Sequence, residues 1–336
     1  VTDTFTITVA NTNDAPTITS TAVTAATEDS AYTYTVTAAD VDAGDTVTLT
    51  GTTVPSWLTF TASTGVLTGT PTNDEVGSHA VVITATDASG ATGTDTFTIV
   101  VANTNDAPTV TSTAVTTATE DSAYTYTVTA SDVDVGDTLT MTGTTVPSWL
   151  TFDTTTGVLA GTPLNANVGA NNVVITINDG TVDVTDTFTI TVANTNDAPT
   201  FTSTAVTAVD EDAAYSYTAA ASDDDGDTVT LAGTTIPAWM TFDATTGALT
   251  GAPTNAEVGS HAVVITATDT NSASTTDSFT VVVANTNDAP TLASALSDAT
   301  IAEDSAYSLD VSGMCTDVDV GDTMAYTLSG NPSTLT

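Results

Sequence analysis

Most of the glutamates in this chain occupy one repeated position. Four of the six are followed at once by an aspartate, and each lies 12 or 13 residues after the proline of a repeated hexapeptide, NTNDAP. The hexapeptide stands at 11–16, 103–108, 194–199 and 285–290. Acidic residues scattered over a surface would not recur at one spacing, so the pattern predicts a shared role. The four residues are Glu28, Glu120, Glu211 and Glu303.

Aspartates and asparagines recur at three further positions. One is a loop of the type DVDAGD, with the candidates Asp40, Asp42, Asp132, Asp134, Asp223, Asp225, Asp317 and Asp319. Another directly follows an apolar segment such as VVITATD, with the candidates Asp87, Asp179 and Asp269. The hexapeptide itself supplies Asn11, Asn13, Asp14, Asn103, Asn105, Asp106, Asn194, Asn196, Asp197, Asn285, Asn287 and Asp288. No later glutamate follows the loop at EF-hand spacing, so that motif is not indicated.

Short segments of alternating polarity position these side chains. In AYTYTVTA (31–38) and DTFTITV (186–192), aromatic and β-branched residues alternate with threonine. This period of two indicates strands with one wet face, and turn sequences such as DAGD and STGV separate them. No segment has a helical period. We therefore predict an all-β fold of tandem Greek-key β-sandwiches, immunoglobulin- or cadherin-like, forming an elongated rod.

The hexapeptide marks the expected boundaries of the repeats. Residues 1–11 resemble the segments at 94–102 and 185–193 and are expected to be the last strand of a preceding repeat, so we treat the chain as a window from a longer protein. Complete repeats are expected at 12–103, 104–194 and 195–285, and the opening half of a further repeat at 286–336.

Threading the chain through such a sandwich brings the acidic positions together. The first strand descends from the hexapeptide, which places Glu28 at the far end, near the next hexapeptide. The second strand returns, so the DVDAGD loop and Asp87 lie at the near end. The junction at 103–108 is then expected to collect Glu28 from above, Asn103, Asn105 and Asp106 from the linker, and Asp132, Asp134 and Asp179 from below.

Carboxylates gathered in this way need a counter-charge. Their mutual repulsion would raise their pKa values, and the chain has 41 acidic residues but neither lysine nor arginine. Calcium accepts six to eight oxygen ligands in flexible geometry, whereas magnesium demands a stricter octahedron and keeps its water. The pattern therefore favours calcium. Two plainer interpretations stay open, namely loops that serve only as turns and a solvated acidic surface suited to brine.

Composition also excludes several functions. Without cationic side chains the chain cannot contact nucleic acid or an anionic membrane surface, and no apolar run is long enough for direct membrane insertion in this window. His79 and His261 share a position that Asn171 occupies in the second repeat. No repeated histidine-based site results, and both histidines are expected in surface loops. We predict no enzyme.

These motifs resemble the cadherin superfamily. NTNDAP is similar to the cadherin inter-repeat linker, DVDAGD to its aspartate loop, ATD at 85–87 to the aspartate after its penultimate strand, and Glu28 to its first glutamate. VPSWLTFTASTGVLTGTP (54–71) more closely resembles the dystroglycan-type cadherin-like and immunoglobulin-like repeats of large bacterial surface adhesins. The resemblance implies calcium between successive repeats. At the acidic lower loop of cadherins this chain has TNDEVG, LNANVG and TNAEVG, which implies fewer ions per junction.

Two functions of different classes follow from this reading. The first is a calcium-rigidified structural rod, either the stalk of an extracellular adhesin or the subunit of a cell-surface filament. Its partners would be neighbouring repeats, other copies in a fibre or a cell-surface ligand. The alternative is an adhesive binding module that recognises glycan, ice or a partner protein. Near-identical repeats favour the rod, because a recognition domain is usually a single divergent copy. Both functions imply an extracellular or cell-surface location.

Overall fold

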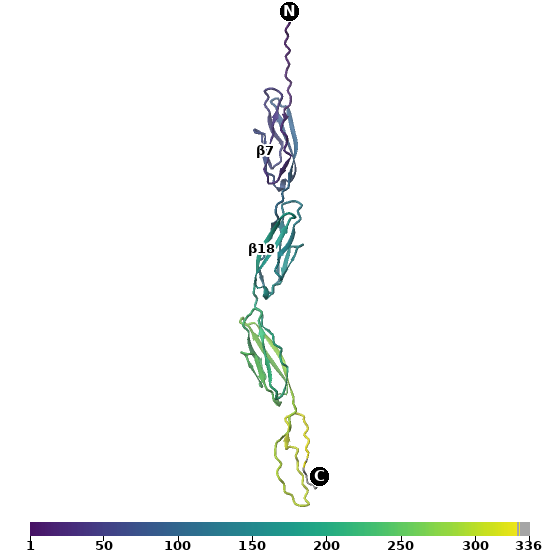
Figure 1. The fold of residues 1–336 in the computed structure, drawn as a ribbon, viewed down its shortest axis with the longest axis vertical. Helices are drawn as coiled ribbons and strands as arrows, with labels where there is room; N and C mark the ends of the chain where they lie inside the picture. The colour runs from purple at the N-terminus through teal and green to yellow at the C-terminus, as the bar shows by residue number, and fades with distance from the viewer. Residues whose placement is uncertain (328, 330–336) are drawn as a thin grey trace. The chain divides into compact units, whose positions relative to one another are not determined.

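The computed structural model describes residues 1–327 and 329, which divide into two compact units, Val1–Ala193 and Asn194–Thr336. Figure 1 shows two sets of strands in the first unit and a third set, followed by a less regular segment, in the second. We call these sets the first, second and third repeats. Apart from three short 3-10 turns, every regular element of the described residues is a strand, so the predicted all-β class is confirmed.

The first repeat consists of a four-stranded sheet, β2-β9-β8-β5, a three-stranded sheet, β3-β7-β6, and the pair β1-β4. The short strand β2 runs parallel to β9, while the other pairs are antiparallel. The elements are β1 (Thr17–Ile18), β2 (Ala25–Thr27), β3 (Tyr32–Thr35), β4 (Ala38–Ala39), β5 (Thr48–Thr53), β6 (Leu58–Thr61), β7 (Val66–Gly69), η1 (Asn73–Glu75), β8 (Gly77–Thr86) and β9 (Thr92–Ala102).

The second repeat has the same topology, with the sheets β11-β18-β17-β14 and β12-β16-β15 and the pair β10-β13. Its elements are β10 (Thr109–Val110), β11 (Thr117–Thr119), β12 (Tyr124–Thr127), β13 (Ala130–Ser131), β14 (Thr140–Thr145), β15 (Leu150–Asp153), β16 (Val158–Gly161), η2 (Asn165–Asn167), β17 (Gly169–Asn178) and β18 (Asp183–Ala193).

The third repeat, in the second unit, has the same sheets again, β20-β27-β26-β23, β21-β25-β24 and β19-β22. Its elements are β19 (Thr200–Phe201), β20 (Ala208–Asp210), β21 (Tyr215–Thr218), β22 (Ala221–Ser222), β23 (Thr230–Thr235), β24 (Met240–Asp243), β25 (Ala248–Gly251), η3 (Asn255–Glu257), β26 (Gly259–Thr268) and β27 (Ser274–Ala284). Beyond it, β28 (Thr291–Leu292) pairs with β29 (Cys315–Thr316) as β1 pairs with β4.

The two ends of the chain are less regular. Residues 1–11, expected as the last strand of a preceding repeat, form no strand here, and Phe5, Ile7 and Val9 are exposed. The expected repeat at 286–336 contains only β28 and β29 among its described residues, and 328 and 330–336 lie outside the described part. None of the helical turns in the described residues has the length and hydropathy to span a membrane.

Each core forms where alternate side chains of the two sheets meet. Along β8, Val81, Ile83 and Ala85 are fully buried, whereas the residues between them are partly exposed. Tyr34 and Leu67 of the opposite sheet close the same cluster. Burying each large apolar side chain contributes about 1.5–3 kcal/mol, which explains why the period-two pattern decides the fold. The tryptophans Trp57, Trp149 and Trp239 pack against these cores.

In each repeat, a tight turn follows the first strand of the four-stranded sheet and fixes the position of the repeated glutamate. The Glu28 N–H donates to the Ala102 carbonyl (3.1 Å), which extends the pairing of β2 with β9. Asp29 then adopts a positive φ of 54°, a conformation that aspartate tolerates better than most residues, and its N–H donates to the Pro71 carbonyl (2.9 Å). The turn therefore holds Glu28 at the end of the sandwich where β9 leaves for the next hexapeptide.

The expectation that the histidines lie in surface loops is wrong. His79 lies within β8 and His261 within β26, and both are only partly exposed. Each ring makes an edge contact with a tryptophan, at 5.9 Å for Trp57 and 5.7 Å for Trp239. Each strand begins two residues before the histidine, at Gly77 or Gly259, so strand pairing holds the histidine in place.

This position distinguishes the second repeat. Asn171 accepts a hydrogen bond from Trp149 Nε1 (3.0 Å), whereas Nε1 of Trp57 and of Trp239 is buried without a partner. We expect Asn171→His to destabilise the second repeat by about 1 kcal/mol, because it leaves a buried donor unpaired. Hydrogen exchange of β17 peptides in chelator should speed up, and His79→Asn should slow exchange in β8. No change in either variant would contradict the assignment of these hydrogen bonds.

Candidate metal centre

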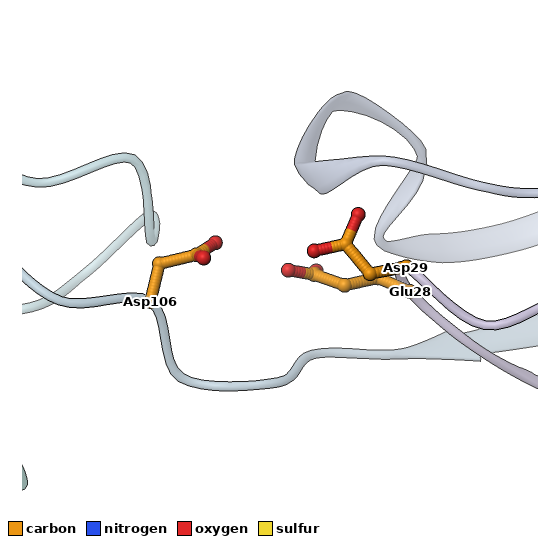
Figure 2. Close-up of side chains that lie close together, drawn as sticks. All are labelled: Glu28, Asp29 and Asp106. Atoms are coloured by element: carbon orange, nitrogen blue, oxygen red, sulfur yellow. The ribbon is translucent and has the colours of Figure 1, made fainter.

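Three carboxylates face one another at the lower end of the first repeat. Figure 2 shows Glu28 and Asp29, from the turn after β2, pointing toward Asp106 of the hexapeptide at 103–108. One oxygen from each lies within 4.8 Å of the others. Asp106 precedes the second repeat in the sequence, so the cluster joins a residue of one repeat to the linker of the next.

Glu28 is the most unusual member of this cluster. It is 2% exposed, and neither of its carboxylate oxygens has a hydrogen-bond partner. Burial is the main cause that raises its pKa, and the negative charges of Asp106, Asp134 and Asp29 raise it further. The backbone N–H of Thr104 acts in the opposite direction without reaching hydrogen-bond geometry. A buried carboxyl group with two unpaired oxygens is costly unless a ligand completes its coordination.

The second unit contains a related cluster, in which the third carboxylate is Asp319 of the aspartate loop and not the residue after the glutamate. Glu211 is 3% exposed, and one of its oxygens lies within 4.8 Å of carboxylate oxygens of Asp288 and Asp319. Its Oε1 accepts a hydrogen bond from the Thr286 N–H (2.7 Å), while Oε2 is buried and unpaired. Glu120 of the first unit, at the equivalent position, is also buried. Glu303 is exposed.

Each hexapeptide is hydrogen-bonded to one end of the repeat that follows it. We call this end the rim; in the second repeat it consists of the aspartate loop at 132–137 and Asp179. At 103–108, Asn105 Nδ2 donates to Asp179 Oδ2 (2.9 Å) and the Asp106 N–H donates to Asp134 Oδ2 (2.7 Å). The same two bonds recur at the other linkers wherever the strands are complete. They are Asn13 to Asp87 (2.8 Å), Asp14 to Asp42 (2.7 Å), Asn196 to Asp269 (2.8 Å) and Asp197 to Asp225 (2.7 Å), and Asp288 donates likewise to Asp319 (2.6 Å).

These amide donors lower the pKa of the aspartates that they contact. The Asn105 side chain is the main cause that lowers the pKa of Asp179, and the equivalent asparagines, Asn13 and Asn196, lower the pKa of Asp87 and Asp269. These three aspartates are therefore held in the ionised form. The rim therefore keeps the negative charge that would bind a cation.

The aspartate loop adds further unpaired oxygens to the same rim. The Asp134 N–H donates to Asp132 Oδ1 (2.9 Å), while Asp132 Oδ2 and Asp134 Oδ1 are buried without partners. Asp40 Oδ2 and Asp223 Oδ2 are likewise unpaired, and the same turn bond joins Asp42 to Asp40, Asp225 to Asp223 and Asp319 to Asp317. Oxygen-only donor sets of this kind suit a hard divalent cation.

Two further groups of residues lie at the clusters although they are not among the candidates predicted from the sequence. The last aspartate of the loop belongs to the rim, because Asp40, Asp42 and Asp45 form one cluster and Asp132, Asp137 and Asp179 another, each within 4.8 Å. Burial and the neighbouring carboxylates raise the pKa of Asp45 and Asp137. The repetition of DxDxGD is the signal that identifies this third aspartate, beside the two predicted from each loop.

The second group is an asparagine that begins each 3-10 turn. Asn73 Nδ2 donates to Asp106 Oδ2 (2.7 Å), and Asn255 Nδ2 donates to Asp319 Oδ1 (2.9 Å). Asn165 is the equivalent residue of η2. Each of the two bonds reaches from the end of one repeat to an aspartate beyond it. The recurrence of asparagine in TNDEVG, LNANVG and TNAEVG could have identified the group.

The remaining linker asparagines have other surroundings. Asn11 Nδ2 donates to Asp42 Oδ1 (2.8 Å), Asn285 Oδ1 accepts from Asn255 Nδ2 (3.4 Å), and Asn287 Nδ2 donates to the Asp288 carbonyl (2.9 Å). Asn103 and Asn194 are exposed.

Comparison with known proteins identifies the repeats. The family described as "Putative Ig domain" matches the chain three times, at residues 15–102, 107–193 and 198–284. The "Serine-rich adhesin for platelets" of Staphylococcus aureus is 34% identical over 149 residues, covering 42% of this chain and 6% of that protein. The version from strain MRSA252 matches equally, with 10% of its length covered. The chain thus spans a tenth or less of these curated relatives.

Solved structures with a similar chain path include two cadherins. The extracellular domain of protocadherin gamma B4 has 21% identity and a TM-score of 0.47, covering 84% of this chain and 52% of that one. Repeats EC22–24 of mouse cadherin-23 have 18% identity and a TM-score of 0.45, covering 82% and 100%. An endo-fucoidan hydrolase of glycoside hydrolase family 107 has 24% identity and a TM-score of 0.29, covering 82% and 45%.

Proposed function

This chain belongs to the family described as "Putative Ig domain", and from that membership we propose that it is a calcium-stiffened stalk segment of an extracellular surface adhesin. The tandem repeats resemble those of surface adhesins, and the curated relative is an adhesin for platelets. Neither the matched family nor that relative is described as an enzyme. The proposed partners are the neighbouring repeats, with a cell-surface ligand for the parent protein or other copies in a fibre.

The observation that carries the proposal is the state of Glu28. A chain without lysine or arginine buries this carboxyl group with both oxygens unpaired and three other carboxyl groups nearby. Water could satisfy the Glu28 oxygens if the carboxyl group were exposed, but it is buried. A lysine or arginine could neutralise its charge, but the chain has neither. A divalent cation satisfies the orphan oxygens and offsets the mutual repulsion at once. The related cluster at Glu211, which has one buried unpaired oxygen, supports the same role.

The proposed mechanism depends on which repeat supplies each ligand. Glu28 and Asn73 belong to the first repeat, Asp106 belongs to the linker, and Asp134 belongs to the second repeat. Glu28, Asp106 and Asp134 would hold the ion, and calcium would supply the positive charge that offsets their mutual repulsion. The linker is already hydrogen-bonded to the rim below it, so the ion would act chiefly on the upper contact, where Asn73 donates to Asp106 and the Glu28 carboxylate lies near it.

The test is an equilibrium titration of the whole chain with calcium. Calorimetry after removal of bound metal should show saturation at millimolar calcium or below, with more than one ion for each linker that has a complete repeat on both sides. Magnesium at the same concentration should bind more weakly, because it retains its water and demands stricter geometry. Absence of heat and of any stoichiometric uptake in equilibrium dialysis at millimolar calcium would contradict the proposal.

A further inference from the structure

The loop that joins the last two long strands has a different sequence in the third repeat. In the first repeat it connects β8 to β9 as Asp87-Ala88-Ser89-Gly90-Ala91, and in the third it connects β26 to β27 as Asp269-Thr270-Asn271-Ser272-Ala273. The backbones match, because the N–H of Ala91 or Ala273 donates to the first aspartate at 2.8 Å in both. The two loops therefore present different side chains from one scaffold.

Asn271 uses this position to join two acceptors. Its Nδ2 donates to Asp227 Oδ2 (2.7 Å), the last aspartate of the loop at 223–227, and also to Oδ1 of Asn196 in the hexapeptide. Asn196 in turn donates through its own Nδ2 to Asp269 Oδ2 (2.8 Å). One neutral amide group thus connects the rim carboxylate to the linker, and all four residues belong to the second unit.

The backbone next to Asn271 shows that the loop is held in this form. Ser272 has φ of 77°, whereas glycine, Gly90, occupies the equivalent position in the first repeat with φ of 90°. A side chain at positive φ costs about 1–2 kcal/mol, and such conformations persist only where the surroundings fix them. The hydrogen bonds of Asn271 are the contacts that the third repeat has and the first, with Ser89, lacks.

The aspartate loop below Asn271 is also altered. It reads DDDGD at 223–227, one residue shorter than DVDAGD at 40–45 and DVDVGD at 132–137. In the first two repeats the last aspartate, Asp45 or Asp137, lies with two other rim carboxylates within 4.8 Å. In the third repeat the equivalent Asp227 accepts a hydrogen bond from an amide.

We propose that Asn271 is an amide clasp that replaces one cation at the rim of the third repeat, so that the linker at 194–199 is held there in the absence of calcium. If calcium binds the linkers as proposed above, the clasp has the consequence that successive linkers respond differently to calcium. The –NH2 group donates one hydrogen to each of two oxygen acceptors. It thereby joins two oxygen atoms that a cation would otherwise have to join.

The isosteric variant Asn271→Asp tests the clasp in the full chain. It keeps the shape of the side chain but replaces the amide donor with a third carboxylate, beside those of Asp227 and Asp269. Hydrogen exchange of peptides that contain 194–199 should accelerate at least threefold in chelator, and calcium should restore the protection. Asn271→Ser, which carries the residue of the first repeat, should accelerate exchange in chelator to the same extent. The control Thr270→Asp adds the same charge one residue away and should change exchange by less than twofold.

The chelator arm tests the clasp by itself. Unchanged exchange at 194–199 in both Asn271 variants would overturn the inference, whatever calcium does. Faster exchange in chelator that calcium fails to reverse in Asn271→Asp would support the clasp and count against calcium as the rim ligand, which is a failure of the proposed function. Equal acceleration in Thr270→Asp and Asn271→Asp would also overturn the inference, because charge alone would explain it.

Discussion

The variant Asp134→Asn is expected to weaken calcium binding at the 103–108 linker by about 30-fold or more, corresponding to about 2 kcal/mol. Asp134 accepts the Asp106 N–H through Oδ2 and buries an unpaired Oδ1 toward the cluster. Asparagine preserves the size of the side chain and one acceptor oxygen, so the loss would come from the charge rather than from a cavity. Replacing both Asp132 and Asp134 with alanine should remove binding at this linker altogether.

The effect should be local. Hydrogen exchange of linker peptides, followed against calcium concentration, separates the sites because the residues after each hexapeptide differ, with TVTS at 109–112 and TFTS at 200–203. In Asp134→Asn the midpoint at 103–108 should move to higher calcium, while the midpoint at 194–199 stays within twofold of the wild type. Asp225→Asn is the matched variant for 194–199. Equal shifts at both linkers in either variant would mean that the carboxylates do not serve separate sites.

Glu28→Gln is expected to act in opposite directions with and without calcium. Without calcium, the variant removes a buried charge that faces Asp106, and the new amide can donate to that carboxylate as Asn73 does. The first repeat should become more stable by about 1–3 kcal/mol. With calcium, the site loses a charged ligand, and affinity should fall by about tenfold or more, which corresponds to about 1.4 kcal/mol.

Hydrogen exchange of the peptide that contains β2 reports both effects at the position of the substitution. The control Asp74→Asn removes the same charge from an exposed position of η1 and should change neither quantity appreciably. Destabilisation by Glu28→Gln in chelator would show that Glu28 is satisfied without an ion. Unchanged calcium affinity would show that it is not a ligand.

The fold class was predictable because the alternating pattern is strong and repeated. Tyr34, Val81 and Ile99 fall on inward positions of strands that contain threonine at the outward positions, and burial of such residues decides which face packs. His79 was misplaced because the glycine and serine before it favour a turn locally, whereas pairing with β9 over the whole strand outweighs that preference. The Trp149–Asn171 bond, a contact between distant residues, has no local sequence pattern.

The candidate site shows a similar limit. The convergence of Glu28 and Asp106 follows from strand direction alone, so counting strands was sufficient to expect it. The asparagines were harder to assign, because an amide can donate or accept and its partner is set by geometry. Asn73 and Asn105 both act as donors to aspartates here, which neither the hexapeptide nor the TNDEVG segment indicates. The amide clasp at Asn271 depends on a loop shortened by one residue elsewhere in the repeat.

The most direct test of the central claim is the distribution of distances across the 103–108 linker. Spin labels at Thr50→Cys and Thr142→Cys, both exposed strand positions, report on the first and second repeats after the single native cysteine is removed by Cys315→Ser. If calcium joins Glu28, Asp106 and Asp134, pulsed dipolar spectroscopy should give a narrow distribution in millimolar calcium and one at least twice as broad in chelator. Glu28→Gln should broaden the distribution in calcium. Distributions of equal width with and without calcium would contradict the claim that calcium stiffens this chain.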